Sequence, residues 1–193
     1  MMLLFLHGWA FDPTLWQAMA AELSGHRLAF ADRGYFGPPA DVRETPDVAV
    51  GHSLGCLILA RDLPPHVPLL AINGFDRFTG VGRVAPRVVQ RMAHRLGEAP
   101  VDVVDAFRRR CGAEPAAMAP DGARLAADLD LLLFAEAPDR PVALLHGDSD
   151  PILPPAMRAA VFPSSPRRQV AGGHLLPLTH APLCADMALS LCR

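Results

Sequence analysis

The sequence predicts an α/β protein built on a mostly parallel, doubly wound sheet. Two observations support this prediction: apolar runs of strand length alternate with amphipathic runs of helical length, and glycine-rich or polar segments follow most of the apolar runs. At 193 residues the chain is long enough to form one domain with a sizeable core. Because sites in such sheets lie beyond the carboxyl ends of the strands, we expect functional residues there, where His7, Ser53 and Asn73 fall.

Hydrophobic periodicity gives the order of the elements. Strands are expected at 2–6, 27–31, 47–50, 67–72, 141–146 and 168–170. Helices are expected at 13–23, 54–62, 86–96, 101–111, 122–136, 155–162 and 181–191. The second and third strands are joined by a short connection without a helical pattern, although a parallel pair usually needs a helical crossover. We therefore expect an abbreviated connection at this point.

The alternation of strands and helices breaks between residues 75 and 138. Three consecutive amphipathic helices there predict a lid over the strand ends, so that residues 1–74 and 139–193 form the core. Between Asp76 and Arg124 the chain carries nine arginines and six acidic residues. An arginine stripe at helical spacing is most simply a solvated helix face, and the alternative is a docking surface for an acidic partner. The stripe consists of Arg87, Arg91 and Arg95.

Charge and hydropathy argue against several classes of function. The formal net charge of −2 gives no general attraction to nucleic acid or to a charged membrane surface, and all 18 basic residues are arginine. No apolar run reaches the length of a membrane span. The apolar N-terminus lacks the charged region and the cleavage site of a signal peptide, so we expect a cytoplasmic protein.

Cysteine and histidine spacing argues against disulfides and metal sites. Cys56, Cys111, Cys184 and Cys192 form no C-x-x-C pair, and a chain of this size does not need disulfides, so reduced thiols are expected. The sequence has neither H-x-x-x-H nor H-E-x-x-H spacing. It also lacks G-x-G-x-x-G and Walker patterns. We expect no metal and no cofactor.

Residues 48–60 have the pattern of a strand, a tight turn carrying a serine, and a helix. The apolar run at 48–50 ends in Gly51-His52-Ser53-Leu54-Gly55, and a second apolar run of helical character follows. A serine in such a strained turn needs glycines on both sides, because the strand and helix backbones approach each other closely. Its hydroxyl then projects beyond the sheet edge, beside the free N–H groups of a helix N-terminus. The pattern predicts that Ser53 is a nucleophile.

A nucleophilic serine needs a base and an acid that orients the base. Asp150 and His174 supply them in the chain order Ser, Asp, His, each on a loop just past a predicted strand. Asp148, on the same loop, is the alternative acid, and His180 is the alternative base. We favour Asp150 because a few residues of loop are needed to swing a carboxylate toward the histidine. We favour His174 because two glycines precede it on a tight loop.

Two N–H donors are expected to stabilise a developing oxyanion. One is Leu54, directly after the serine, and the other is Trp9, on the loop after the first strand. His7 is interpreted as a brace for that loop, and His52 as a packing residue.

Four short motifs give the chain a resemblance to the α/β-hydrolase superfamily over its whole length. They are Leu-His-Gly-Trp at 6–9, Gly-His-Ser-Leu-Gly at 51–55, Gly-Asp-Ser-Asp-Pro-Ile-Leu-Pro at 147–154 and Gly-Gly-His at 172–174. More narrowly, the chain resembles the pimeloyl-acyl-carrier-protein methyl ester esterases of biotin synthesis. This second resemblance rests on His-Gly-Trp, on Ala-Ile-Asn-Gly at 71–74 and on Phe-Arg-Arg-Arg-Cys-Gly at 107–112.

The resemblance implies a serine carboxylester hydrolase with the triad and oxyanion donors named above. It makes Phe107 a candidate wall for the acyl chain and implies an acidic acyl-carrier protein as partner. The lid arginines that would attract this partner are Arg87, Arg91, Arg95, Arg108, Arg109 and Arg110. The alternatives are another small-acyl esterase or thioesterase, a triad-dependent lyase of the menaquinone-synthesis type and, more remotely, a non-catalytic binding protein of the same fold.

Two departures from the superfamily pattern concern packing. The chain begins directly at the strand before the His-Gly loop, without the two usual N-terminal strands, and no helix precedes the elbow strand. Neither departure removes a catalytic group. Both leave sheet surface that we expect to be uncovered, or covered by a partner subunit.

Overall fold

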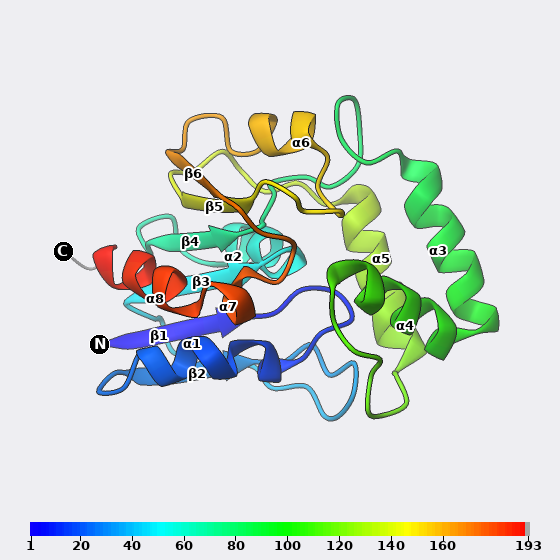
Figure 1. Ribbon diagram of the computed structural model, residues 1–193, viewed down its shortest axis with the longest axis horizontal. Helices are drawn as coiled ribbons and strands as arrows, with labels where there is room; N and C mark the ends of the chain where they lie inside the picture. Colours follow the sequence, from blue (N-terminus) through cyan, green and yellow to red (C-terminus); the bar gives the residue numbers. More distant parts are fainter. Residues whose placement is uncertain (192–193) are drawn as a thin grey trace.

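A parallel sheet forms the centre of the molecule. The computed structural model describes residues 1–191, and within this range six strands form one sheet in the order β2-β1-β3-β4-β5-β6, with all neighbours parallel (Figure 1). The strands are β1 (Met2–Leu6), β2 (Arg27–Ala31), β3 (Val48–His52), β4 (Leu69–Ile72), β5 (Ala143–Gly147) and β6 (Arg167–Val170). The predicted doubly wound α/β fold is confirmed. The direction of winding reverses between β1 and β3, so a crevice is expected at the carboxyl ends of these two strands.

Apart from His52 and His146, the central strands are apolar, because the sheet is covered on both faces. Every residue of β1, β3 and β4 is buried, without the alternation of a strand that has one exposed face. The edge strands are more polar: β2 is largely half-buried, and β6 carries the exposed Arg167 and Arg168. Charged edges of this kind discourage pairing with another chain.

Helices lie on both faces of the sheet (Figure 1). On one face α1 (Gln17–Glu22) packs against α7 (Leu176–Thr179) and α8 (Ala181–Ser190), while α2 (Leu54–Asp62) lies behind the strands in this view. The predicted helix at 13–23 begins as a 3₁₀ turn, η1 (Pro13–Trp16), capped by Asp12. Helix α6 (Pro155–Ala160) follows β5. The sequence analysis missed α7, because a single turn is too short to show a helical period.

The connection between β2 and β3 contains no helix, as the sequence predicts. Residues 32–47 instead run as an irregular segment, in which Asp32 and Ala40 exchange backbone hydrogen bonds of 2.9 and 3.0 Å. Without a crossover helix, a groove of about 410 Å³ stays open between this segment and α2, with Leu4, Leu6 and Ile58 among the residues that line it. The Leu4 and Leu6 side chains beside this groove are nevertheless buried, so the missing helix exposes little of β1, less than the sequence analysis expects.

The three helices between β4 and β5 lie beyond the carboxyl ends of the strands (Figure 1). They are α3 (Pro86–Glu98), α4 (Pro100–Cys111) and α5 (Gly122–Phe134). A buried carboxylate joins this lid to the core: Asp128 of α5 accepts hydrogen bonds of 2.8 and 2.5 Å from the Arg33 guanidinium and a further one from the Tyr35 hydroxyl. Trp9 adds a second tie, because its Nε1 donates to the Leu125 carbonyl at 2.9 Å.

The thiols are buried and separate. Cys56, Cys111 and Cys184 are free, and Cys192 lies outside the described residues. Burial raises the pKa of Cys184 to about 12 and raises those of the other two as well, so these thiols are poor nucleophiles. In the described part of the chain no helix is both long and apolar enough to cross a membrane.

His146 of β5 is a buried histidine outside the predicted site. Its side chain is fully buried, and neither ring nitrogen has a hydrogen-bond partner among the described residues. Burial lowers the pKa of His146 from 6.5 to about 4. Above the higher value both the native and the unfolded histidine are neutral, whereas between the two values only the unfolded chain takes up the proton. Native stability therefore falls as the pH drops through this window.

The substitution His146→Leu is expected to weaken this pH dependence. At about pH 7.5 the variant should be at least as stable as the wild type, because two unpaired polar atoms leave the core. Between about pH 6.5 and about pH 5 the wild type should lose about 1.4 kcal/mol per pH unit more than the variant. Urea unfolding at each pH measures the free energy of unfolding of the wild type and of the variant. Parallel curves would show that His146 is not the titrating group.

Candidate active site

Ser53 occupies the tight turn between β3 and α2. Its backbone has φ 53° and ψ −120°, a conformation that a non-glycine residue adopts only under strain. The flanking glycines make this turn possible. A Cβ at Gly51 would lie 2.7 Å from Cys56 Cα, and a Cβ at Gly55 would lie 2.1 Å from the Leu6 carbonyl oxygen. The turn thus brings Ser53 to the crevice between β1 and β3.

A buried carboxylate orients the predicted base. Nδ1 of His174 donates to Oδ2 of Asp150 at 2.8 Å, and both side chains are fully buried. The other carboxylate oxygen accepts from the Ile152 N–H at 2.7 Å. Burial alone would raise the pKa of Asp150, but the charge and hydrogen bond of His174, together with backbone N–H donors, lower it below its ordinary value. Asp150 is therefore an anion at neutral pH.

The structure brings Asp150, and not Asp148, to the imidazole. The exposed Asp148 accepts hydrogen bonds from Ser149 Oγ at 2.8 Å and from the Gly172 N–H at 3.3 Å, so it joins the loops after β5 and β6. The alternative base, His180, lies at the start of α8, where Nδ1 contacts Thr179 Oγ1 at 2.9 Å. In the part of the chain that the structure describes, neither alternative side chain forms a hydrogen bond or ion pair with the Asp150 or His174 side chain.

The base keeps one ring nitrogen available. Nε2 of His174 is buried and has no hydrogen-bond partner among the described residues. The imidazole of His52, the neighbour of Ser53, packs against the His174 ring with centroids 4.7 Å apart. With Nδ1 held by Asp150, Nε2 is the atom that can accept a proton from a serine hydroxyl.

Two residues hold the loop that carries His174, and the sequence analysis gave neither this role. Nδ2 of Asn73 donates to the carbonyl oxygens of Gly173 and His174 at 3.0 and 2.9 Å, and Oδ1 accepts from the Gly147 N–H at 2.9 Å. Nε2 of His52 also donates to the His174 carbonyl, at 2.9 Å. Burial, and to a lesser extent the nearby charge of His174, lowers the pKa of His52 to about 3. His52 is therefore neutral at neutral pH.

The sequence contained a partial signal for one of these residues. Asn73 ends β4, beside the strand that precedes the Asp150 loop, and its φ of 46° suits asparagine better than most residues. His52, interpreted from the sequence as a packing residue, does pack in the core and also donates the hydrogen bond above. That bond joins residues far apart in the chain, so no local pattern indicates it.

The loop after β1 packs closely against Ser53. A Cβ at Gly8 would lie 2.9 Å from Ser53 Cβ, and Ala10 in the same loop has φ 60°. The Trp9 N–H has no hydrogen-bond partner among the described residues, and Leu54 begins α2, where an N–H group has no partner within the helix. These are the two donors that the sequence predicts for an oxyanion.

His7 contacts backbone groups through both ring nitrogens. Nδ1 donates to the Gly8 carbonyl at 2.9 Å, and Nε2 accepts from the Arg33 N–H at 3.1 Å. Nε2 also lies 3.2 Å from Asp32 Oδ1. These contacts hold the loop after β1 against the loop after β2, in agreement with a bracing role.

A chamber of about 460 Å³ opens beside Asp150, between the lid and the core. Phe107 of α4 forms part of its wall, and the Phe107 ring packs edge-on against Trp9 with centroids 5.0 Å apart. Phe78 and Ile152 contribute further apolar surface. Within residues 1–191, no group of three or more His, Cys, Asp or Glu side chains is placed to hold a metal ion. The chamber therefore offers a largely apolar space of small-molecule size next to Asp150.

No family model matches the chain, and no curated protein matches it. Several solved structures are similar in fold. An esterase (EaEST) from Exiguobacterium antarcticum has a TM-score of 0.76 at 13% identity, over 98% of this chain and 90% of that chain. Olei00960, a hydrolase from Oleispira antarctica, has a TM-score of 0.75 at 14% identity, over 99% and 90%. MenH from S. aureus has a TM-score of 0.71 at 15% identity, over 98% and 92%.

These likenesses establish the α/β-hydrolase fold for this chain. At such identities they do not determine a reaction or a substrate, because one fold hosts many chemistries. The chemistry has to be argued from the site itself.

The substitution Asn73→Gly is expected to slow the reaction of Ser53 with a fluorophosphonate probe by about tenfold or more. Glycine keeps the positive φ without strain, so the change removes only the side chain that fixes the His174 loop. Probe labelling followed by mass spectrometry measures the rate. Thr79→Ala, which removes a buried hydrogen bond of 3.0 Å to the Leu133 carbonyl, is the control for general destabilisation. Equal labelling of Asn73→Gly and wild type would contradict the positioning role.

Proposed function

We propose that this protein is a serine hydrolase that cleaves carboxylic esters. The observation that carries the proposal is the 2.8 Å hydrogen bond between Asp150 and His174, whose ring packs against His52, the residue before Ser53 in its strained turn. An oriented imidazole with a free Nε2 is what a serine needs to become a nucleophile. The α/β-hydrolase fold supports the same assignment by analogy.

The proposed reaction uses the side chains in a fixed order. Ser53 Oγ attacks the ester carbonyl while Nε2 of His174 takes the hydroxyl proton, and Asp150 stabilises the resulting imidazolium. The N–H groups of Trp9 and Leu54 stabilise the oxyanion. His174 then protonates the leaving alcohol, which leaves an acyl group on Ser53. Water, deprotonated by His174, attacks this acyl-enzyme, and His174 returns the proton to Ser53 Oγ as the carboxylic acid leaves.

We propose the methyl ester of pimeloyl-acyl-carrier protein as the particular substrate. The support is the resemblance of the His-Gly-Trp and Phe-Arg-Arg-Arg-Cys-Gly segments to the esterases of biotin synthesis. The apolar chamber beside Asp150, with Phe107 in its wall, suits an acyl chain. An esterase or thioesterase for other small acyl groups and a lyase that uses the same triad are the alternatives.

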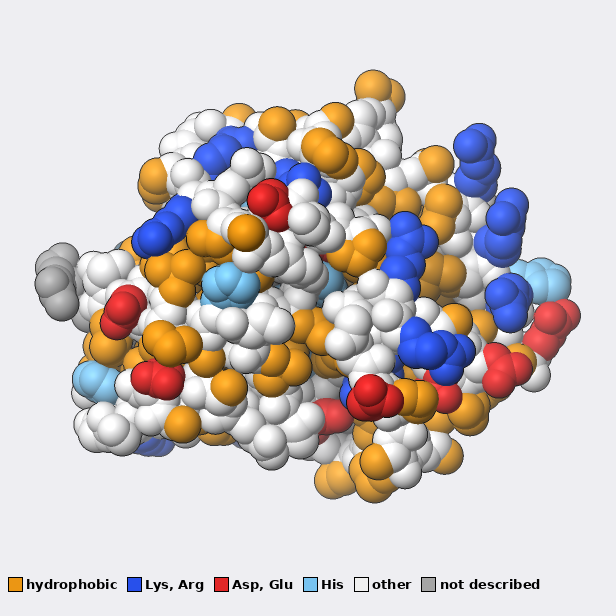
Figure 2. Space-filling view, viewed as in Figure 1, with side chains coloured by type: hydrophobic (Ala, Val, Ile, Leu, Met, Phe, Trp, Pro, Cys, Tyr) orange, Lys and Arg blue, Asp and Glu red, His pale blue; other side chains and the backbone are white. Residues whose placement is uncertain are grey.

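The charge on the lid supports an acidic partner, but only locally. Residues 75–138 carry nine arginines and nine acidic residues, so the lid as a whole has no net charge. The excess is confined to α3 and α4, which hold six arginines and three acidic residues, and Figure 2 shows basic side chains gathered in this region. Such a local patch attracts an acidic protein and raises its association rate.

Arg108 is the least available of the six candidate docking arginines. Its guanidinium donates to the carbonyl oxygens of Ala10 and Glu114 at 2.9 and 2.8 Å and lies 5.0 Å from the centre of the Phe11 ring. The other five are exposed. The proposed docking surface therefore consists of Arg87, Arg91, Arg95, Arg109 and Arg110.

Complementation of a biotin auxotroph that lacks its pimeloyl-ester esterase tests the triad and the substrate together. The wild type should restore growth and Ser53→Ala should not, because removal of the nucleophile lowers kcat by about 10³-fold or more. Hydrolysis of a short p-nitrophenyl ester by the purified proteins is the control. If this hydrolysis depends on Ser53 but neither protein restores growth, the hydrolase proposal stands and the biotin assignment is wrong.

Turnover of the carrier-bound ester is expected to depend steeply on salt. Raising the ionic strength from about 0.05 M to about 0.5 M should lower kcat/KM by about tenfold, because screening weakens the attraction between the acidic carrier and the arginine patch. A short neutral ester, measured in parallel, should show little change. Salt-independent turnover of the carrier-bound substrate would contradict the docking surface.

A further inference from the structure

A second, smaller cavity continues the chamber that adjoins Asp150. This crevice lies between α3 and α4 and has a volume of about 230 Å³. The crevice and the chamber share four lining residues, Val88, Met92, Phe107 and Arg110. An acyl chain that occupies the chamber beside Asp150 therefore has a path past Phe107 into the crevice.

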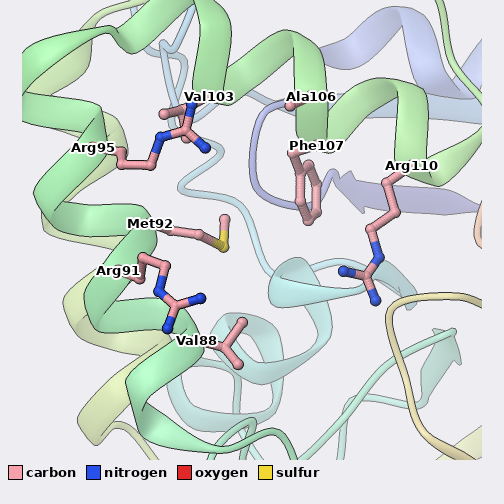
Figure 3. A pocket seen from close by; sticks show the side chains of 8 residues that line it. All are labelled: Val88, Arg91, Met92, Arg95, Val103, Ala106, Phe107 and Arg110. Carbon is pink, nitrogen blue, oxygen red and sulfur yellow. The ribbon is translucent and has the colours of Figure 1, made fainter.

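The crevice has apolar walls and a cationic rim. Met92 and Phe107 lie in its middle, while Arg91 and Arg95 extend from α3 on one side and Arg110 extends from α4 on the other (Figure 3). No carboxylate is among the lining residues. Guanidiniums that surround one small space repel each other, and a bound anion relieves that repulsion.

The rim arginines differ from the other lid arginines in their partners. Arg83 pairs with Asp76 at 2.7 Å, and Arg124 pairs with Asp121 at 3.2 Å. By contrast, the side chains of Arg91 and Arg95 have no hydrogen bond or ion pair within the described part of the chain. Arg110 makes one hydrogen bond, from Nη2 to the Pro151 carbonyl at 2.8 Å, which keeps the guanidinium near the Asp150 loop. The donors of the rim remain available to a ligand.

We propose that the crevice binds the terminal carboxylate of an acyl chain, so that the protein accepts free half-esters of dicarboxylic acids. The ester lies at Ser53, the methylene chain passes Phe107 and Met92, and the far carboxylate pairs with the guanidiniums of Arg91 and Arg95, which line the crevice but not the chamber. A planar guanidinium offers two parallel N–H donors to a carboxylate, which suits this task. The inference rests on the proposed ester hydrolysis at Ser53, but its binding step can be tested without turnover.

Calorimetry with Ser53→Ala provides the first test. Monomethyl half-esters of dicarboxylic acids of increasing chain length are titrated beside the matched neutral dimethyl esters. At the best-fitting length, the half-ester should bind about tenfold more tightly than the diester. Equal affinities of the two compounds at every length would overturn the inference.

Variants that remove charge then test whether the crevice causes the preference for the half-ester over the diester. In the Ser53→Ala background, Arg91→Gln with Arg95→Gln should abolish the preference for the half-ester. Arg61→Gln with Arg168→Gln removes the same charge from exposed positions outside the lid and should retain the preference. A preference that survives the first pair of substitutions would overturn the inference, because the crevice would then not be its source.

Two further measurements separate this inference from its rivals. Wild type that binds the half-ester but hydrolyses neither half-ester nor diester would refute the proposed esterase and leave the carboxylate site standing. A phosphate could supply the same negative charge from the prosthetic arm of a carrier protein, so 4′-phosphopantetheine is titrated as well. If it binds more tightly than every half-ester and loses affinity in Arg91→Gln with Arg95→Gln, the crevice is a phosphate site and the carboxylate assignment is wrong.

Discussion

The close approach of backbones between β1 and β3 is the constraint on which the site depends. A Cβ at Gly55 would lie 2.1 Å from the Leu6 carbonyl, and one at Gly8 would lie 2.9 Å from Ser53 Cβ. The elbow helix and the loop after β1 can therefore meet only where glycine stands at both positions. This packing holds Ser53 at a positive φ, since the residue has no local preference for that conformation. It also brings the two predicted oxyanion donors to the serine.

The positions of Asp150 and His174 depend on a second set of contacts, at the carboxyl ends of β4, β5 and β6. Asn73 joins the end of β5 to the His174 loop through hydrogen bonds in both directions. A Cβ at Gly147 would lie 2.3 Å from the Gly172 carbonyl oxygen, so the loops after β5 and β6 are also in direct contact. Strand register therefore brings these loops together, and the path of the loop after β5 then decides which carboxylate meets His174.

Much of the fold and part of the site could be predicted because both have strong local patterns. Alternating apolar runs indicated the sheet, and paired glycines around Ser53 indicated the elbow. Asp148 and Asp150 could not be separated with the same force, since both lie on one loop and only the three-dimensional path of that loop decides which carboxylate meets His174. The hydrogen bonds of Asn73 and His52 were missed for a related reason: they join residues more than seventy positions apart.

The lid shows why a count of arginines in a sequence overstates a binding surface. Arg108 lies in the same basic run as its neighbours, yet it binds backbone carbonyls and stacks near Phe11, which makes it a link between lid and core. On α3, residues one turn apart share a face, so Arg91 and Arg95 both reach the crevice. The six arginines therefore fall into three groups. Arg108 links the lid to the core. Of the five exposed arginines proposed for docking, Arg91, Arg95 and Arg110 also line the crevice, whereas Arg87 and Arg109 do not.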